Sequence, residues 1–308
     1  MEVALVEHAA TRLLYDVHHQ TTFAWLISIY FYFTGLSAGS FVVSTMSYGF
    51  GMKLYKPISR LAVVTATTCL FIAPVALLMQ VGWPIRSIWN HFTYLNFSSP
   101  MTYGAFLLVA YPVVCVFYAI YMFRGNDRMT KLLGRIGIPT AIATHGYTGF
   151  ILAFGKARAY WNTALMPTLF LVSAIVSGLA LMILLVMGFF RFVRDERAVP
   201  SEIVDGLAKL LGWTIVADLF LTFSDIAVLS ISHEGAQEMT WLVLGGSFTP
   251  LFVVVENLLG KVLPMIVCFV PALRRNHWVL ALACAGVVIG IFFMRYVTVF
   301  GGQVLPLM

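Results

Sequence analysis

Long apolar runs recur along the whole sequence, and each is close to the length of a membrane-spanning helix. A helix needs about 20 apolar residues to cross about 30 Å of hydrocarbon. The pattern predicts spanning helices at residues 23–49, 61–81, 103–123, 136–155, 166–190, 210–231, 241–270 and 278–300. Gly245, Gly246 and Pro250 interrupt the seventh run, so we expect its first part to bend or to lie at the membrane surface.

The composition agrees with a membrane protein, because 60% of residues are hydrophobic and only 10% are charged, against about 25% charged in soluble domains. We therefore predict an all-α integral membrane protein of eight spanning helices in two four-helix bundles, as a single domain over residues 1–308. Each cysteine lies in an apolar run without the spacing of metal ligands, so we expect no iron–sulfur cluster, zinc site or disulfide in this chain. These cysteines are Cys69, Cys115, Cys268 and Cys284.

Basic residues follow the odd-numbered spans, which predicts the orientation of the chain in its membrane. On that side lie Lys53, Lys56, Arg60, Arg124, Arg128, Lys131, Arg135, Arg191, Arg194, Arg197, Lys209, Arg274 and Arg275; on the other lie Arg12, Arg86, Lys156 and Arg158. Both termini, the 82–102 connection and the 156–165 turn are thus expected on the outer, periplasmic side. Because the basic residues lie in short loops, the net charge of +6 predicts no nucleic-acid partner.

No cleavable signal peptide is expected in the first 20 residues.

Five ionisable residues lie inside the predicted spans, where each charge costs about 2.5–3.5 kcal/mol and marks a functional candidate. They are Asp218, Asp225, Glu256, Lys261 and Arg295. Asp218 and Asp225 share one face of their helix, together with Thr222, whereas Glu256 and Lys261 would not share a face of an α-helix. Two interpretations stay open: a path for protons, or ion pairs that only hold the bundle together.

Two tyrosines at similar depth, Tyr30 and Tyr147, suggest a site for a quinone head group, since small residues beside both allow neighbouring helices to approach closely. We expect His91, Arg158 and Asn162 to complete this site from the outer connections. The alternative is that both tyrosines only pack, with hydroxyls bonded to the backbone, and that Arg158 is an interfacial anchor.

A haem site is not expected, because His145 is the only histidine near mid-membrane and a bis-histidine haem needs two facing imidazoles. His145 itself is interpreted as a hydrogen-bonded packing residue rather than as a ligand.

Several sequence blocks together resemble the NrfD/polysulfide-reductase-type integral membrane subunits, in the right order over nearly the whole chain. The blocks are Tyr30-x-x-x-x-Gly35-Leu-Ser-Ala-Gly39, Asn96-Phe97-x-Ser99-Pro100-Met101-x-x-Gly104, Tyr147-Thr-Gly149-Phe150 with Trp161-Asn162 and Pro167, Ser173-x-x-x-x-Gly178, Glu256-x-x-x-Gly260-x-x-x-Pro264, and Arg295-Tyr296 with Gly302-Gln303. Some members of that family carry histidine at the position of Tyr30.

This resemblance implies a subunit of the bacterial or archaeal cytoplasmic membrane that binds menaquinone or ubiquinone among its first four helices. Its implied partners are a peripheral iron–sulfur protein of the four-cluster type and a catalytic molybdopterin, cytochrome or hydrogenase subunit. Quinol oxidation releases electrons that need a metal centre, so we expect a partner cluster docked on the 82–102 and 156–165 segments. His91, Arg158 or Asp16 would exchange the protons.

The predicted function is therefore a quinone-binding subunit of a respiratory oxidoreductase, coupled to proton movement and not catalytic alone. Two alternatives stay open. The first is a secondary transporter that uses the midplane charges, although the sequence shows no internal repeat. The second is a membrane anchor without a site of its own.

Overall fold

The structure, a computed structural model, describes residues 23–193, 201–232 and 234–304, and within these ranges every regular element is a helix. The long helices are α1 (Trp25–Tyr48), α2 (Ser59–Val81), α4 (Pro100–Phe123), α5 (Asp127–Ala153), α6 (Met166–Gly188), α7 (Ser201–Ile231) and α11 (His277–Val304). The shorter ones are η2 (Lys53–Ile58), α3 (Pro84–Thr93), η3 (Phe189–Val193), α8 (Glu234–Leu244), η4 (Pro250–Val262), α9 (Leu263–Phe269) and α10 (Pro271–Arg274).

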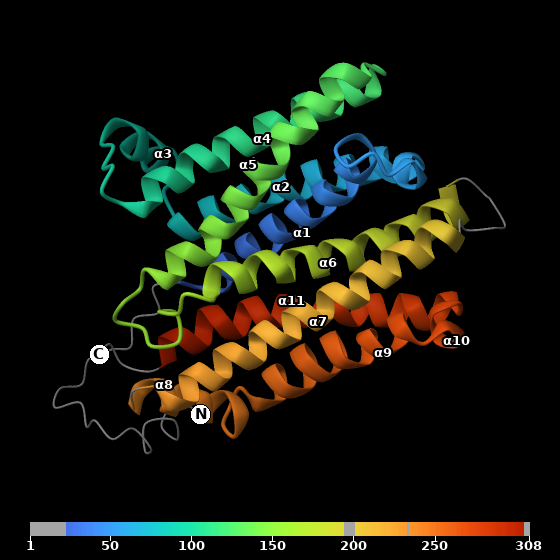
Figure 1. Cartoon of the computed structure of the whole chain (residues 1–308). Coiled ribbons are helices and arrows are strands. Elements are labelled where there is room, and N and C mark those ends of the chain that lie inside the picture. Colours follow the sequence, from blue (N-terminus) through green and yellow to red (C-terminus); the bar gives the residue numbers. More distant parts are fainter. Residues whose placement is uncertain (1–22, 194–200, 233, 305–308) are drawn as a thin grey trace.

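The long helices form two groups of four that lie side by side (Figure 1). The first group consists of α1, α2, α4 and α5, and the second consists of α6, α7, α11 and the continuous pair η4–α9. Helices α1 and α5 of the first group pack on α6 of the second. The sequence predicted two four-helix bundles; the contact of α1 and α5 with α6 joins the two groups into one packed unit.

Close backbone contact between α1 and α6 joins the two groups. A Cβ atom built on Gly39 would lie 2.3 Å from the carbonyl oxygen of Ala174, and one built on Gly178 would lie 2.5 Å from the Cα of Gly39. No residue with a side chain fits at this crossing without moving the helices apart. The small residues predicted to permit close approach therefore do so here.

Seven helices are long and apolar enough to cross a membrane within the described ranges, so the protein is an integral membrane protein. Six are α1, α4, α6, α7, α11 and the η4–α9 pair, and the seventh is η2–α2. Helix α5 is not among the seven, although it is long enough. Its first turns carry Asp127, Arg128, Lys131 and Arg135, and the uncharged remainder includes His145 and several threonines and glycines. Its later part is the predicted fourth span, and it packs along α4, α6 and α1.

The predicted interruption of the seventh run is present. Helix α8 ends at Leu244, just before Gly245, and η4 begins at Pro250. The spanning part is therefore Pro250–Phe269 rather than the whole of 241–270.

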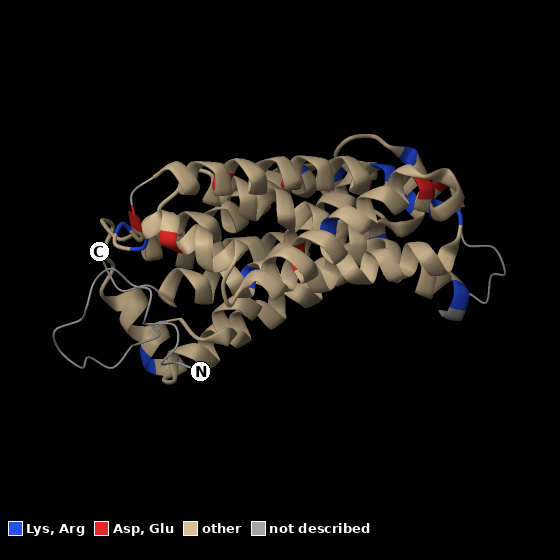
Figure 2. Ribbon diagram, turned by 90° about the horizontal axis from the view of Figure 1, so that it is seen from below, with Lys and Arg blue, Asp and Glu red and all other residues tan. Residues whose placement is uncertain are grey.

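Charged residues gather mainly near the ends of the helices (Figure 2). The basic loops predicted to face inward lie at one end of the molecule, as far as the structure describes them. The same end holds η2, α10 and the start of α5. At the opposite end the first and last described segments are tied together: the Phe23 amide donates to Gln303 Oε1 over 2.9 Å, and Gln303 Nε2 donates to the Phe23 carbonyl over 3.0 Å. Arg12, Asp16, Arg194 and Arg197 lie outside the described residues.

Candidate functional site

The ring of Tyr147 on α5 lies against the backbone of Gly104 on α4. A Cβ built on Gly104 would fall 1.9 Å from Tyr147 Cζ and 2.2 Å from its hydroxyl oxygen. The missing side chain at position 104 thus makes the space that the Tyr147 phenol occupies. Gly104 and Tyr147 belong to separate sequence blocks, and the fold brings them into contact.

Tyr30 lies on α1, which packs against the helix α5 that carries Tyr147; Tyr30 is buried and Tyr147 is half-buried. Among the described residues, neither hydroxyl has a hydrogen-bond partner. The predicted alternative, two hydroxyls bonded to the backbone, is therefore not what the described part of the chain shows. The surroundings of Tyr30 are apolar, with Ile27, Phe31 and Leu152 in the same buried cluster. Two hydroxyl donors in an apolar setting are suited to the oxygens of a hydrophobic ligand.

His91, expected in the same site, lies on α3. Its ring contacts Phe92, whose ring packs on Phe106 of α4, two residues beyond Gly104. The Nε2 atom of His91 is buried and has no hydrogen-bond partner in the described part of the chain. No residue of α3 is buried as a whole, and several of its apolar side chains are exposed, Ile85 by 85% and Trp89 by 70%.

Arg158 and Asn162, expected near the tyrosines, lie in the loop from 154 to 165 that joins α5 to α6. Arg158 donates to the Gln303 carbonyl over 3.3 Å and lies 5.9 Å from the Trp161 ring, and partial burial lowers the pKa of its guanidinium from the ordinary value. The Asn162 side chain is exposed. Trp161 is buried against Gly302, and its indole N–H donates to the Thr298 carbonyl over 2.7 Å. This loop is thus fastened to the end of α11.

A buried ion cluster occupies the second group of helices. Lys261 Nζ lies 2.9 Å from Asp218 Oδ2 and 2.9 Å from Glu256 Oε1, and it donates to the Thr222 hydroxyl over 3.1 Å. All the charged groups of this cluster are essentially inaccessible to solvent. These ion pairs join α7 to η4. The sequence analysis named such pairs between helices as one of two interpretations of the buried charges, beside a path for protons.

The expectation that Glu256 and Lys261 occupy different faces was wrong. Residues 250–262 form a π-helix, in which residues five apart lie above one another, rather than an α-helix. This winding brings the carboxylate and the ammonium group into direct contact. Of the stripe predicted on one face of α7, Asp218 and Thr222 contact Lys261, and Asp225 lines a pocket together with Glu256.

Arg295 on α11 lies in a separate buried position, facing α5 and α6. Its guanidinium is 3.7 Å from the centre of the Phe170 ring, and Nη2 donates to the Phe170 carbonyl over 2.9 Å and to the Ser173 hydroxyl over 2.6 Å. His145 Nε2 lies 2.7 Å from the same carbonyl, so His145 is hydrogen-bonded in the packing, as expected. Arg295 makes no ion pair with the described carboxylates, although it interacts electrostatically with Asp218 and Glu256.

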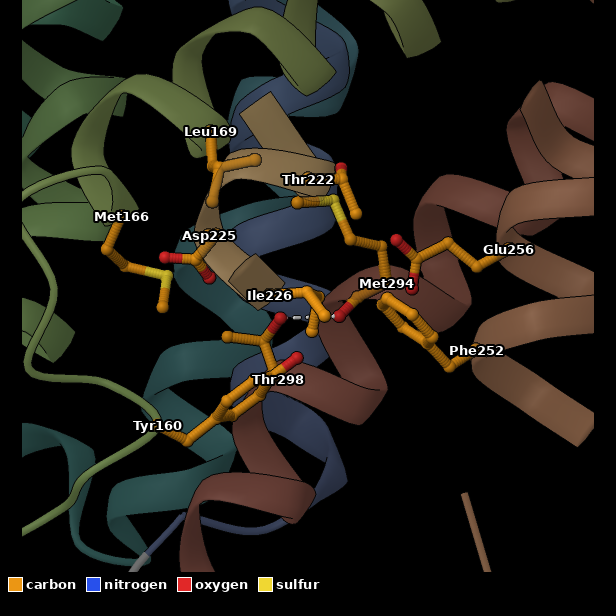
Figure 3. A pocket seen from close by; sticks show the side chains of 10 residues that line it. All are labelled: Tyr160, Met166, Leu169, Thr222, Asp225, Ile226, Phe252, Glu256, Met294 and Thr298. Carbon is orange, nitrogen blue, oxygen red and sulfur yellow. Dashed lines mark hydrogen bonds between the residues drawn. The ribbon is translucent and has the colours of Figure 1, made fainter. Parts of the chain in front are cut away.

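Asp225 and Glu256 line a small pocket between α6, α7, η4, α11 and the 154–165 loop (Figure 3). The pocket has a cavity volume of about 20 Å³, enough for about one or two water molecules. Hydroxyl groups of Tyr160, Thr222 and Thr298 also line it. Outside the pocket, the Thr163 hydroxyl donates to Asp225 Oδ1 over 2.9 Å.

Sequence reasoning missed Tyr160, Thr163 and Thr298, which surround Asp225. A single residue with a hydroxyl group, in a loop or on an apolar helix, shows no sequence pattern that distinguishes a site residue from a packing residue. Tyr160 and Thr163 do lie within the turn that the sequence indicated, but that turn was expected to serve the tyrosine site.

With this geometry established, comparison with known proteins identifies the class. The sequence profile described as "Polysulphide reductase, NrfD" matches residues 16–306. The chain therefore belongs to the NrfD family of integral membrane proteins.

Three relatives illustrate the range of the family. The chain is 28% identical over 281 residues to an Hdr-like menaquinol oxidoreductase integral membrane subunit of Archaeoglobus fulgidus, covering 89% of this chain and 69% of that one. It is 27% identical to a selenate reductase subunit of Mesobacillus selenatarsenatis, covering 92% and 74%. It is 25% identical to the protein NrfD of Escherichia coli, covering 91% and 94%.

Proposed function

We propose that this protein is the quinone-binding membrane subunit of a respiratory oxidoreductase complex. The observation that carries the proposal is that Tyr30 and Tyr147 lie on two helices that pack together, α1 and α5, and that neither hydroxyl has a hydrogen-bond partner among the described residues. Tyr30 also lies in a cluster of buried apolar side chains. The name of the Archaeoglobus relative supports a menaquinol substrate. Ubiquinone is the alternative occupant of the same site.

The residues present fit such a ligand. A quinone has a carbonyl oxygen at each side of a flat apolar ring, and it exchanges electrons together with protons when bound. Tyr147, held in place by the absence of a side chain at Gly104, would donate to one oxygen, and Tyr30 would orient the ring. His91, whose buried Nε2 has no hydrogen-bond partner in the described part of the chain, is the candidate for proton exchange at the outer end, a role that imidazole groups commonly take.

Electrons need a metal centre, and this chain is expected to carry none, so the complex requires a partner. We propose a peripheral iron–sulfur protein of the four-cluster type, attached in turn to a molybdopterin, cytochrome or hydrogenase subunit. The exposed aromatic side chains of the 82–102 segment offer a surface for it at the tyrosine end of the molecule.

The proposed topology has eight spans: the seven long apolar helices and, as the fourth span along the chain, α5. Both ends of the chain lie on the outer side of a bacterial or archaeal cytoplasmic membrane. Helix α5 packs along three spanning helices over its apolar part, and its charged first turns lie at the end of the bundle with the other basic loops. That distribution follows the positive-inside rule.

Proton movement coupled to quinol oxidation is the second part of the proposal. The second group of helices buries the ion cluster of Lys261, Asp218 and Glu256, the carboxyl group of Asp225, which shares a pocket with Glu256, and the separate guanidinium of Arg295. Buried charges of this kind are costly in a membrane and mark transport paths for ions.

The experiment is quinol-linked electron transfer by the purified complex carrying Tyr147→Phe. We expect a large loss of rate, because the donor to the quinone oxygen is removed while the ring remains. Tyr103→Phe is the matched control, since Tyr103 is exposed and its hydroxyl donates to the Phe97 carbonyl. An unchanged rate in Tyr147→Phe would remove this residue from the site, and solute uptake by the isolated chain would favour the transporter alternative.

A further inference from the structure

The charges of the buried polar set are balanced except at one residue. Lys261 contacts Asp218 and Glu256, and Arg295 interacts electrostatically with the same two carboxylates. The charges of these two cations and two acids sum to zero, although Arg295 makes no ion pair with either acid. Asp225 is the additional acid, and it makes no ion pair within the described ranges.

An unpaired carboxylate in an apolar interior is strongly disfavoured, and it becomes neutral by taking up a proton. The only hydrogen bond of Asp225 within the described chain comes from the Thr163 hydroxyl to Oδ1. Its second oxygen has no hydrogen-bond partner there. Asp225 is therefore the acid in this set that can gain or lose one proton without breaking an ion pair.

The pocket connects Asp225 with the balanced cluster. Asp225 projects from α7 and Glu256 from η4, and both line the same space with Thr222 and Thr298 (Figure 3). One or two water molecules in that space would provide the hydrogen bonds that join the two carboxyl groups. Glu256 in turn contacts Lys261, which contacts Asp218.

Tyr160 is the remaining titratable group that faces the pocket. Burial and the nearby carboxylates Glu256 and Asp225 hold the pKa of its phenol well above the usual range. Tyr160 thus stays protonated and does not itself carry the proton.

The loop that supplies Thr163 also follows directly after the helix that carries Tyr147. It is fastened to α11 by the bond from Trp161 to the carbonyl of Thr298, a residue that also borders the pocket. The segment from Phe154 to Leu165 thus links the tyrosine site to the environment of Asp225 through a short stretch of chain.

We propose that Asp225 is the residue through which the buried polar set exchanges protons with the outer side, and that Thr163 is the positioning residue that holds it. When the Thr163 bond is made, it stabilises the ionised carboxylate, because a hydroxyl donor favours the charged form. When the loop shifts and the bond is lost, the ionised form loses that support and Asp225 takes up a proton. This inference rests on the proposed function, since quinol oxidation drives the exchange.

The test uses the whole complex in liposomes, with quinol-linked electron transfer and the response of a pH-sensitive dye measured together. For Asp225→Asn we expect electron transfer to continue and the dye response to be lost. For Thr163→Val we expect a lower ratio of protons to electrons and a shifted pH profile of that ratio, with both restored in Thr163→Ser. Asp205→Asn is the control, because Asp205 is an acid on the same helix that pairs with Lys209 and Arg274 outside the path.

Asp225→Asn with the parent ratio of protons to electrons would overturn the proposal, as would a parent complex that oxidises quinol without moving protons. If Asp225→Asn does not assemble, the Thr163→Val and Thr163→Ser pair decides, and equal ratios in both would overturn it. A parent complex that oxidises no quinol would instead contradict the proposed function, and the inference would fall with it.

Discussion

Gly104 shows how a residue without a side chain can define a site. Its position on α4 is filled by the ring of Tyr147 from α5, so any added atom competes with the phenol for the same space. The sequence marked both residues within separate blocks, and only the fold shows that one makes room for the other. The function of Tyr147 should therefore depend on position 104.

Gly104→Ala is expected to displace the Tyr147 ring and to slow quinol-linked electron transfer markedly, because the new Cβ would lie 1.9 Å from Cζ. Gly146→Ala is the matched control: it adds the same methyl group beside Tyr147 on α5, where nothing lies within 4 Å. Steady-state rates of both variants in the purified complex check this. Equal rates in the two variants would contradict the assigned role of the ring position.

Lys261→Met would leave Asp218 and Glu256 without their shared cation. Removing one partner of a buried pair typically destabilises a protein by about 3–5 kcal/mol. The thermal unfolding midpoint in detergent should fall accordingly. Lys209→Met is the control, since Lys209 is 58% exposed in its pair with Asp205, and surface pairs contribute at most about 1 kcal/mol. Similar midpoints for both variants would show that the cluster is not held by Lys261.

At the scale of whole elements, the π-helix at 250–262 is what sequence reasoning could not foresee. Spacing arguments assume 3.6 residues per turn, and under that assumption Glu256 and Lys261 point apart. The wider winding aligns residues five apart and creates the contact at 2.9 Å. By contrast, the break before Pro250 and the polar face of α7 followed from local residue types and were predicted.

The α1–α6 crossing gives an element-scale prediction. Gly39→Ala would place Cβ 2.3 Å from the Ala174 carbonyl oxygen, and overpacking of this kind costs about 1–3 kcal/mol. We expect a lower thermal midpoint and a smaller yield of assembled protein. Gly188→Ala near the end of α6 meets nothing within 4 Å and should behave as the parent. No difference between the two would mean that the helices adjust freely at this crossing.

At the scale of the whole molecule, the all-helical membrane fold and the family were predictable because apolar run lengths and several motif blocks are strong signals. The surroundings of Asp225 were not, because Tyr160, Thr163 and Thr298 come from a loop and a distant helix and carry no pattern of their own. Tyr30 and Tyr147 were expected in one site, and the helices that carry them, α1 and α5, pack against each other. Arg158 and Asn162 were expected beside them, yet the loop that carries them is fastened to α11 instead.

Labelling with a membrane-impermeant maleimide tests two proposals together: that α5 spans the membrane, and the orientation of the chain. The four native cysteines are buried, so they should react little. Lys156→Cys and Lys131→Cys place exposed thiols at opposite ends of α5. We expect the first to be labelled in intact cells and the second only after the membrane is opened. Labelling of both from the outside would mean that α5 does not cross.

A quinone bound beside Tyr30 and Tyr147 is the basis of the proposed function, and photo-crosslinking would locate it. A photoactivatable quinone would be bound to the purified complex, irradiated, and mapped to the peptides that it labels. We expect crosslinks on peptides of α1, α4 or α5, lost when excess menaquinone or ubiquinone competes. Crosslinks confined to the second group of helices, or insensitive to competing quinone, would contradict a site between these two tyrosines.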